Sequence, residues 1–168
     1  VMTDFTEQIM PKFMSFLRFV EFDGNLNIFH LMQDQWTKKG TDSEDEDGDE
    51  LVFKAEKVQP QSVANEKKVF ESLRQMCEVA LAKYPNTLES DYELLKDESL
   101  TFNQRNCVLF RSGEKEILHF LIEFSDYAQQ LLVMSFKDAK KTTQALPDKF
   151  STTREYLQTQ LIPLLGHK

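Results

Sequence analysis

The sequence predicts an all-α fold, and three observations carry this prediction. The 168 residues include only five glycines and five prolines. Apolar residues recur at spacings of three and four, and no segment of convincing length shows the alternation of a half-buried strand. The clearest extended run, residues 50–54, would form one edge strand at most. With 40% apolar residues and 14 phenylalanines, a chain of this length is expected to form one folded domain with a substantial core.

The N-terminal third predicts two helices. Pro11 suits the first turn of a helix. The apolar stripe of that helix consists of Phe13, Phe16, Leu17 and Val20. The Asp-Gly-Asn run at 23–25 is expected to end it. Residues 27–36 are expected to form a second, short helix that places Trp36 on its apolar side.

Two further helices are predicted between residues 62 and 99. Ser62 is a favourable N-cap, and the helix it opens is expected to run to Tyr84, ahead of Pro85. Its inner stripe is Val69, Phe70, Leu73, Met76, Cys77, Ala80, Leu81 and Tyr84. Asn86 and Glu89 have the spacing of a capping box, which opens a short helix. Leu88, Tyr92 and Leu95 are expected to face inward from it.

The longest periodic segment, about 101–136, predicts a central helix with other helices on two sides. Thr101 and Gln104 form a capping box at its start. Its stripe is Phe110, Gly113, Ile117, Leu121, Phe124, Ala128 and Leu131, widened by Leu118, Ile122 and Leu132. Gly113 is expected to let a neighbouring backbone come close. A polar link at 137–144 and a C-terminal helical extension at 151–165 follow, the latter contributing Tyr156, Leu157, Leu161 and Ile162.

The negative charge is concentrated in one segment. The net charge is -8, and residues 41–50 carry seven acids and no base, leaving 20 bases against 21 acids elsewhere. The acids are Asp42, Glu44, Asp45, Glu46, Asp47, Asp49 and Glu50. Nucleic acids and anionic membranes need basic patches and are not expected as partners. A calcium loop is not expected either, because Lys54 would occupy its twelfth position.

Two interpretations of this acidic segment remain open. It is either a solvated, disordered insertion or a steering surface for a basic protein such as a ribosomal protein or a histone. Ser43, which precedes three acids, is a possible phosphorylation site for an acidophilic kinase.

The sequence predicts no catalytic, cofactor or metal site in this chain. The imidazoles His30, His119 and His167 form no pattern of nucleophilic catalysis, and no glycine-rich phosphate loop is present. Cys77 and Cys107 lie on predicted apolar stripes, where inert buried thiols are common. Two cysteines, no secretory pattern and no run of ~20 apolar residues favour an intracellular protein in the cytoplasm or nucleus.

Two linked motifs resemble a known family. Residues 81–95 read Leu-Ala-Lys-Tyr-Pro-Asn-Thr-Leu-Glu-Ser-Asp-Tyr-Glu-Leu-Leu, with a Thr-x-Glu-x-Asp helix start and paired leucines. Residues 111–118 read Arg-Ser-Gly-Glu-Lys-Glu-Ile-Leu, and residues 11–18 end in Phe-Leu-Arg. In this order the segments resemble the substrate-binding domain of Rubisco large-subunit methyltransferases over about residues 10–132, with the acidic segment as an insertion.

The resemblance implies an all-helical, non-catalytic module that docks a folded protein substrate. In that family the module follows a SET domain, which transfers methyl from S-adenosylmethionine to a lysine or, in one branch, a histidine. SET catalytic motifs are not found in the 168 residues. The resemblance implies no catalytic role for Arg111, Gly113, Glu114 and Lys115, which are expected to be structural, with Arg111 and Glu114 pairing along one helix face. The alternative for these residues is a contact with the adjoining catalytic domain or with the substrate.

Two other classes of function stay open at this stage. The chain could be a free-standing helical interaction domain without a methyltransferase partner. It could also be an enzyme in its own right, in which case S-adenosylmethionine would bind the isolated chain.

Overall fold

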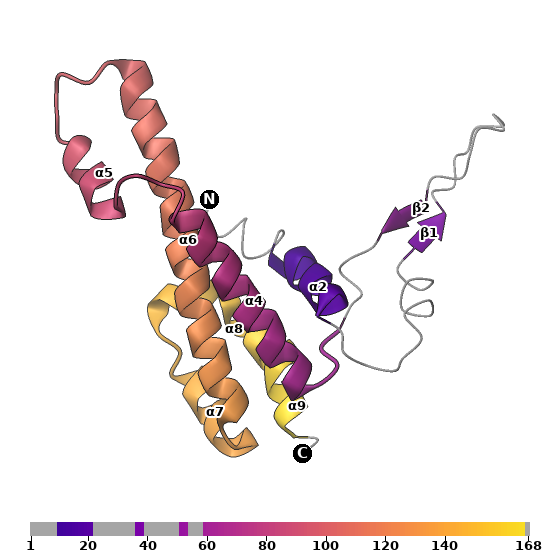
Figure 1. The fold of residues 1–168 in the computed structure, drawn as a ribbon. Helices are drawn as coiled ribbons and strands as arrows, with labels where there is room; N and C mark the ends of the chain where they lie inside the picture. Colours follow the sequence, from indigo (N-terminus) through magenta and orange to yellow (C-terminus); the bar gives the residue numbers. More distant parts are fainter. Residues whose placement is uncertain (1–9, 22–35, 39–50, 54–58, 167–168) are drawn as a thin grey trace, which may run out of the picture.

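The computed structural model describes residues 10–21, 36–38, 51–53 and 59–166, and its architecture is all-α (Figure 1). Helix α4 (Val63–Leu81) and helix α6 (Phe102–Val133) form its long axis. They run antiparallel, since Arg74 on α4 pairs with Asp126 while Tyr84, just after α4, bonds Glu114. Helix α2 (Met10–Val20) packs on α4, and α5 (Leu88–Leu94) packs on α6. The predicted fold class is confirmed.

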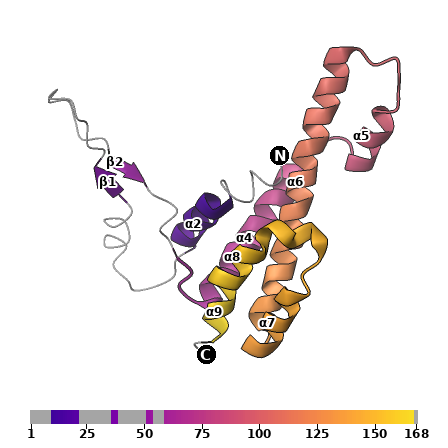
Figure 2. The same ribbon diagram turned by 180° about the vertical axis from the view of Figure 1, so that it is seen from behind.

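The C-terminal segment folds back beside the lower part of α6 (Figures 1 and 2). It comprises α7 (Phe136–Gln144), the 3-10 helix η3 (Asp148–Thr153), α8 (Arg154–Tyr156), the π-helical turn η4 (Leu157–Leu161) and α9 (Ile162–Leu165). The expected apolar residues of this segment do reach the core, because Leu157, Leu161 and Ile162 are buried and Tyr156 is partly buried. Residues 137–144, expected to be a polar link, instead form most of α7.

Helix starts follow the expected capping chemistry in two of three places. The Ser62 side chain accepts from the backbone N–H of Asn65, and Thr101 with Gln104 forms the expected capping box. Helix α5 starts one residue later than expected, because its N-cap is Thr87, which accepts from the N–H of Ser90. Helix α4 ends at Leu81 rather than Tyr84, where two tighter turn bonds replace the helical pattern.

Aromatic rings around Phe124 form the centre of the core. Its ring centre lies 5.8 Å from that of Phe70 on α4, 6.0 Å from Phe150 and 6.1 Å from Tyr156. Helix α2 adds Met10, Met14 and Leu17 to the same cluster. Three separate stretches of the sequence therefore share one core, and α6 is its central element.

The inward faces were predicted less well at their ends. Met76 on α4 and Phe110 on α6 are exposed, although both lie on the predicted stripes. The space a side chain at Gly113 would occupy is open, so the expected close backbone approach is wrong. The long helix ends at Val133, because Ser135 caps a new helix by accepting from the N–H of Asp138.

A short antiparallel strand pair is the one extended feature among the described residues. Strand β1 (Trp36–Lys38) pairs with β2 (Leu51–Phe53), with Trp36 opposite Phe53. The single edge strand considered for 50–54 is thus one half of a pair. Of the helix expected over 27–36, residues 27–35 lie outside the described residues and Trp36 belongs to β1.

A buried ion cluster joins α2, near the N-terminus, to α8 in the C-terminal segment. Arg18 on α2 donates from Nε to Glu66 Oε1 on α4 at 2.7 Å and from its guanidinium to Glu66 Oε2 at 3.1 Å. The same guanidinium donates to the Tyr156 hydroxyl at 2.6 Å. Burial raises the pKa of Tyr156, so the hydroxyl stays protonated. The cluster fixes α2 and α8 against α4.

Candidate functional site

The N-terminal half of α6 extends beyond the helical bundle, with α5 beside it (Figure 1). We call residues 82–118 the arm: the turn after α4, helix α5, the loop that follows, and the first half of α6. Both family-like motifs lie almost entirely within it. The contacts within the arm therefore show which of the motif residues have structural partners.

Lys115 anchors the start of α5 from inside the arm. Its side chain is 1% exposed, and Nζ donates to Asp91 Oδ2 at 2.6 Å, to Asn86 O at 2.6 Å and to Thr87 O at 3.3 Å. Nζ also lies 5.0 Å from the ring centre of Tyr84. Three acceptors match the three protons of an ammonium group. Lys115 is thus fully engaged in holding the loop and α5.

Asp91 is the buried anion that Lys115 and Arg111 share. Arg111 donates from Nε to Asp91 Oδ2 at 3.1 Å and from its terminal nitrogen to Oδ1, a bidentate pair. The hydrogen bond from Arg111, followed by that from Lys115, holds the pKa of Asp91 below its usual range despite burial. At the other end of α5, Arg105 donates to the carbonyls of Leu95 and Asp97 at 2.8 and 3.0 Å.

Two tyrosine hydroxyls complete the attachment. Tyr84 donates to Glu114 Oε2 at 2.7 Å, and Tyr92 donates to Glu116 Oε1 at 2.5 Å. These bonds raise the pKa of both tyrosines, that of Tyr92 to about 12. The expected pairing of Arg111 with Glu114 along α6 is wrong, because both side chains reach across to the other side of the arm instead.

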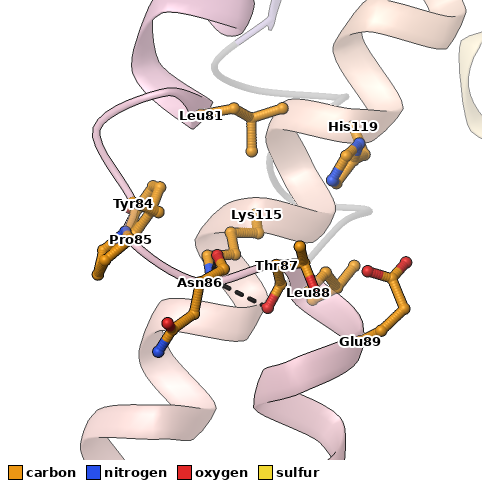
Figure 3. A pocket seen from close by; sticks show the side chains of 9 residues that line it. All are labelled: Leu81, Tyr84, Pro85, Asn86, Thr87, Leu88, Glu89, Lys115 and His119. Atoms are coloured by element: carbon orange, nitrogen blue, oxygen red, sulfur yellow. Dashed lines mark hydrogen bonds between the residues drawn. The ribbon is translucent and has the colours of Figure 1, made fainter.

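A pocket of about 310 Å³ opens between the end of α4, the start of α5 and α6 (Figure 3). Its lining combines apolar and polar side chains: Leu81, Tyr84, Pro85, Asn86, Thr87, Leu88, Glu89, Lys115 and His119. Hydrogen bonds from its own N–H and from the Thr87 hydroxyl hold the pKa of Glu89 below its usual range. The volume lies at the small end for a ligand site, and the Lys115 cation in its wall is already fully bonded.

The structure locates the predicted site residues unevenly. The acidic segment, with Asp42, Glu44 to Asp47, Asp49, Glu50 and the possible phosphosite Ser43, lies outside the described residues, as do His30 and His167. Of the two cysteines, Cys77 is buried and desolvation raises the pKa of its thiol to about 11. Cys107 is exposed, so the expectation that it is buried is wrong.

The described residues contain neither a cluster of metal-binding side chains nor a membrane-spanning helix. Within that part of the chain, histidine, cysteine and acidic side chains form no group of three or more that could hold a metal ion. None of the described helices is both long and apolar enough to cross a membrane.

Two features of the arm are not evident from periodicity. Asp91 was not among the residues expected to face inward from α5, yet it is buried and receives hydrogen bonds from Arg111 and Lys115. Its one signal is its place in the Thr-x-Glu-x-Asp motif. The second feature is a row of exposed apolar side chains on α6, formed by Phe102, Leu109 and Phe110.

Comparison with known families gives one match. The family model described as Rubisco LSMT substrate-binding matches residues 2–118, more than half of the chain. The match covers the whole arm and ends partway along α6. Comparisons with curated proteins and with solved structures give no match.

Proposed function

The chain belongs to the Rubisco LSMT substrate-binding family, and we propose from this premise that it docks a folded protein substrate for a SET-type methyltransferase domain. The observation that carries the proposal is the family match over residues 2–118. In the structure, the charged residues of the long-helix motif support α5. Arg111 donates its hydrogen bonds to Asp91, and Lys115 donates to Asp91 and to loop carbonyls. This supports a binding scaffold rather than a reacting centre.

The mechanism we propose is recognition. The module holds the substrate so that a target side chain, a lysine or a histidine, reaches the pocket of an adjoining SET domain, which would bind S-adenosylmethionine. Linking the two domains raises the effective concentration of the substrate at that pocket. Correct placement contributes further to the rate. We infer an intracellular setting, in the cytoplasm or nucleus, from the two unpaired cysteines.

We propose that residues 1–168 act as one domain with the C-terminal extension as an integral part. Tyr156 in the extension receives a hydrogen bond from Arg18 at 2.6 Å, and Leu157, Leu161 and Phe150 are buried in the shared core. Removing the extension would take Tyr156, Leu157 and Leu161 away, expose the core side chains that they cover, such as Phe124, and leave the buried Arg18–Glu66 pair with one partner fewer.

The acidic segment at 41–50 is a second proposed contact. Its seven acids would steer a basic substrate by long-range attraction, and phosphorylation of Ser43 would add charge. Deleting residues 42–50 and measuring association with a basic protein at low and moderate salt tests this. The deletion is expected to slow association at low salt and to leave the rate at moderate salt unchanged. Association rates that are unchanged at both salt concentrations would contradict the steering role.

The docking function is tested in the intact gene product. Translating the reading frame upstream of Val1 is expected to give an in-frame SET domain. A stop codon followed by Met2 as initiator would instead favour a free-standing interaction domain. With the SET domain present, deleting this module is expected to lower kcat/KM for a protein substrate roughly tenfold or more while S-adenosylmethionine affinity stays unchanged.

Calorimetry separates docking from catalysis by the module itself. S-adenosylmethionine titrated into the 168-residue chain is expected to give no binding heat. Saturable binding of the cofactor to this chain would overturn the proposal and favour an enzyme.

A further inference from the structure

The arm carries three large apolar side chains in solvent. Phe102 is 78% exposed, Phe110 is 70% exposed and Leu109 is 50% exposed. All three belong to the half of α6 that extends beyond the bundle (Figure 1). We call them the α6 apolar face. Exposed apolar side chains are ordinary when scattered singly, but several large ones gathered along one face of a single helix indicate an interaction surface. On that face the polar Asn106 lies between Phe102 and Phe110, so the three form a row and not one continuous patch.

These three residues lie on one side of the helix, and that side leads into the core. Leu109 lies seven residues after Phe102, and Phe110 lies eight residues after Phe102. Both spacings bring a side chain back to the same face of an α-helix. Ile117, seven residues after Phe110, packs against the core, and Phe124, fourteen residues after Phe110, is buried in it. Gly113 lies between them, with open space where a side chain would be. A partner's backbone can therefore approach α6 closely at this point.

Helix α5 covers a different side of α6. Arg105, Arg111 and Lys115 hold it from outside the heptad rows of the α6 apolar face. Glu116, which accepts from Tyr92, lies on the row of Leu109 and marks the border between the two sides. Figures 1 and 2 show α5 and the loop that follows it beside this half of α6, and none of the other described elements reaches it. The core-forming stripe of α6 thus continues onto a part of the helix where the described chain supplies no cover.

The size and charge of this surface disfavour a second copy of the chain as its occupant. Three side chains of this kind present on the order of 400 Å², about half of what one partner of a stable interface buries. The arm also carries five exposed carboxylates, of Glu89, Glu93, Asp97, Glu98 and Glu116, against the exposed Lys83 and Lys96. Lys96 already pairs with Glu93 at 2.6 Å. Two such arms would repel each other.

We propose that the α6 apolar face binds an amphipathic, basic helical segment of the protein substrate. The inference rests on the proposed docking function and names the surface and the substrate chemistry. A straight stripe on a helix matches anchors spaced at i, i+3, i+4 and i+7 on a partner helix. Glu116, seven residues after Leu109 on the same row, accepts from Tyr92 through Oε1. Together with the other exposed acids of the arm it gives the surroundings of this face a net negative charge, which matches basic residues flanking those anchors. The small apolar area fits a transient substrate contact.

The test uses the 168-residue chain and a synthetic probe. The probe is a fluorescein-labelled peptide of ~18 residues with leucines at i, i+3, i+4 and i+7 and lysines on the opposite face. Fluorescence anisotropy is expected to show saturable binding. Two comparison peptides have the same composition in scrambled order, or glutamate in place of lysine, and each is expected to bind roughly tenfold more weakly or worse.

Matched variants locate the binding surface. The double variant Phe102→Ser, Phe110→Ser is expected to weaken probe binding roughly tenfold. Val133→Ser removes an equally exposed apolar residue, 68% exposed, at the other end of the same helix and is expected to leave binding unchanged. Both variants change solvent-facing side chains, and unaltered circular dichroism and Tm verify that the fold persists.

Three outcomes overturn the inference. The scrambled peptide binds as well as the probe, or the double variant binds like the wild type, or Val133→Ser weakens binding equally. Sedimentation velocity adds a fourth, since a concentration-dependent dimer that the double variant abolishes would identify a second copy as the occupant.

The same double variant in the SET-containing protein separates this inference from the proposed function. If deleting the whole module lowers kcat/KM for a protein substrate but the double variant does not, docking stands and this surface is wrong. If deletion of the module has no effect on methylation, the proposed function itself fails.

Discussion

Replacing Lys115 with methionine should detach α5 from α6. The change removes the ammonium group, which bonds Asp91, Asn86 O and Thr87 O, while the methionine stem retains most of the apolar packing. Asp91 keeps its bidentate bond from Arg111, but Asn86 O loses a 2.6 Å partner. The loss should therefore appear in the arm rather than in the core around Phe124.

The expected cost is roughly 3 kcal/mol. Hydrogen bonds to charged groups contribute about 1.5–3 kcal/mol each and do not add fully, and breaking a buried ion pair costs about 3–5 kcal/mol. We take the low end because Arg111 still neutralises Asp91 and because the arm is thin, so water can reach the site after a small opening. A loss of this size raises the population of the opened arm by about 100-fold.

Hydrogen exchange measures this opening directly. The informative amides are those of Asp91 and Leu95, which bond Thr87 O at 3.3 Å and Asp91 O at 3.0 Å within α5. Their protection factors should fall about 100-fold in Lys115→Met.

The matched control is Lys149→Met, which removes an exposed pair with Glu123 at 2.7 Å, both side chains being more than half exposed. Such a pair contributes at most about 1 kcal/mol, so α5 protection should not change. Equal α5 protection in the wild type and Lys115→Met would refute the anchoring role.

Three more predictions concern the buried polar groups and the thiols. Tyr156→Phe removes the acceptor of the 2.6 Å bond from Arg18 and should lower the free energy of unfolding by about 1.5–3 kcal/mol, read from urea denaturation; an unchanged midpoint would count against the cluster. Cys107 should react with a thiol reagent at pH 8 much faster than Cys77, whose thiol pKa is about 11, and equal rates would contradict this burial pattern. The pKa of Asp91 is lowered in the folded state, so its contribution is complete above about pH 4 and is lost as the pH falls through the lowered value. Asp91→Asn should therefore be less stable than the wild type at pH 7 and lose less stability on acidification, measured by Tm from pH 7 to 2.

Helix boundaries were predictable where local capping chemistry decides them. The start of α6 follows from Thr101 and Gln104, whose side chains satisfy backbone groups within the same turn. The break after Val133 carries a similar local signal, Ser135 three residues before Asp138, but the continuing apolar periodicity hides it. Periodicity reports which residues favour a helix and does not report where two helices join end to end.

The arm was harder to predict because its partners are distant in sequence. Asp91 bonds residues 20 and 24 positions away, and a periodic pattern assigns a lone carboxylate to solvent. The exposure of Phe110 is the converse case. It lies on a stripe that is buried further along α6, and only the length of α4 determines where that burial ends. The side-chain pattern indicates which residues favour burial, whereas the neighbouring helix determines which of them are buried.

Because α6 is one unbroken helix of 32 residues, it acts as a lever between the body and the arm. The half of α6 that belongs to the arm extends for about 24 Å, so a tilt of ~10° at the core would move the far end by about 4 Å. The position of Phe102 is therefore set by how tightly Phe124 is held among Phe70, Phe150 and Tyr156. Substitutions deep in the body, far from any partner, would shift the alignment of whatever the arm holds.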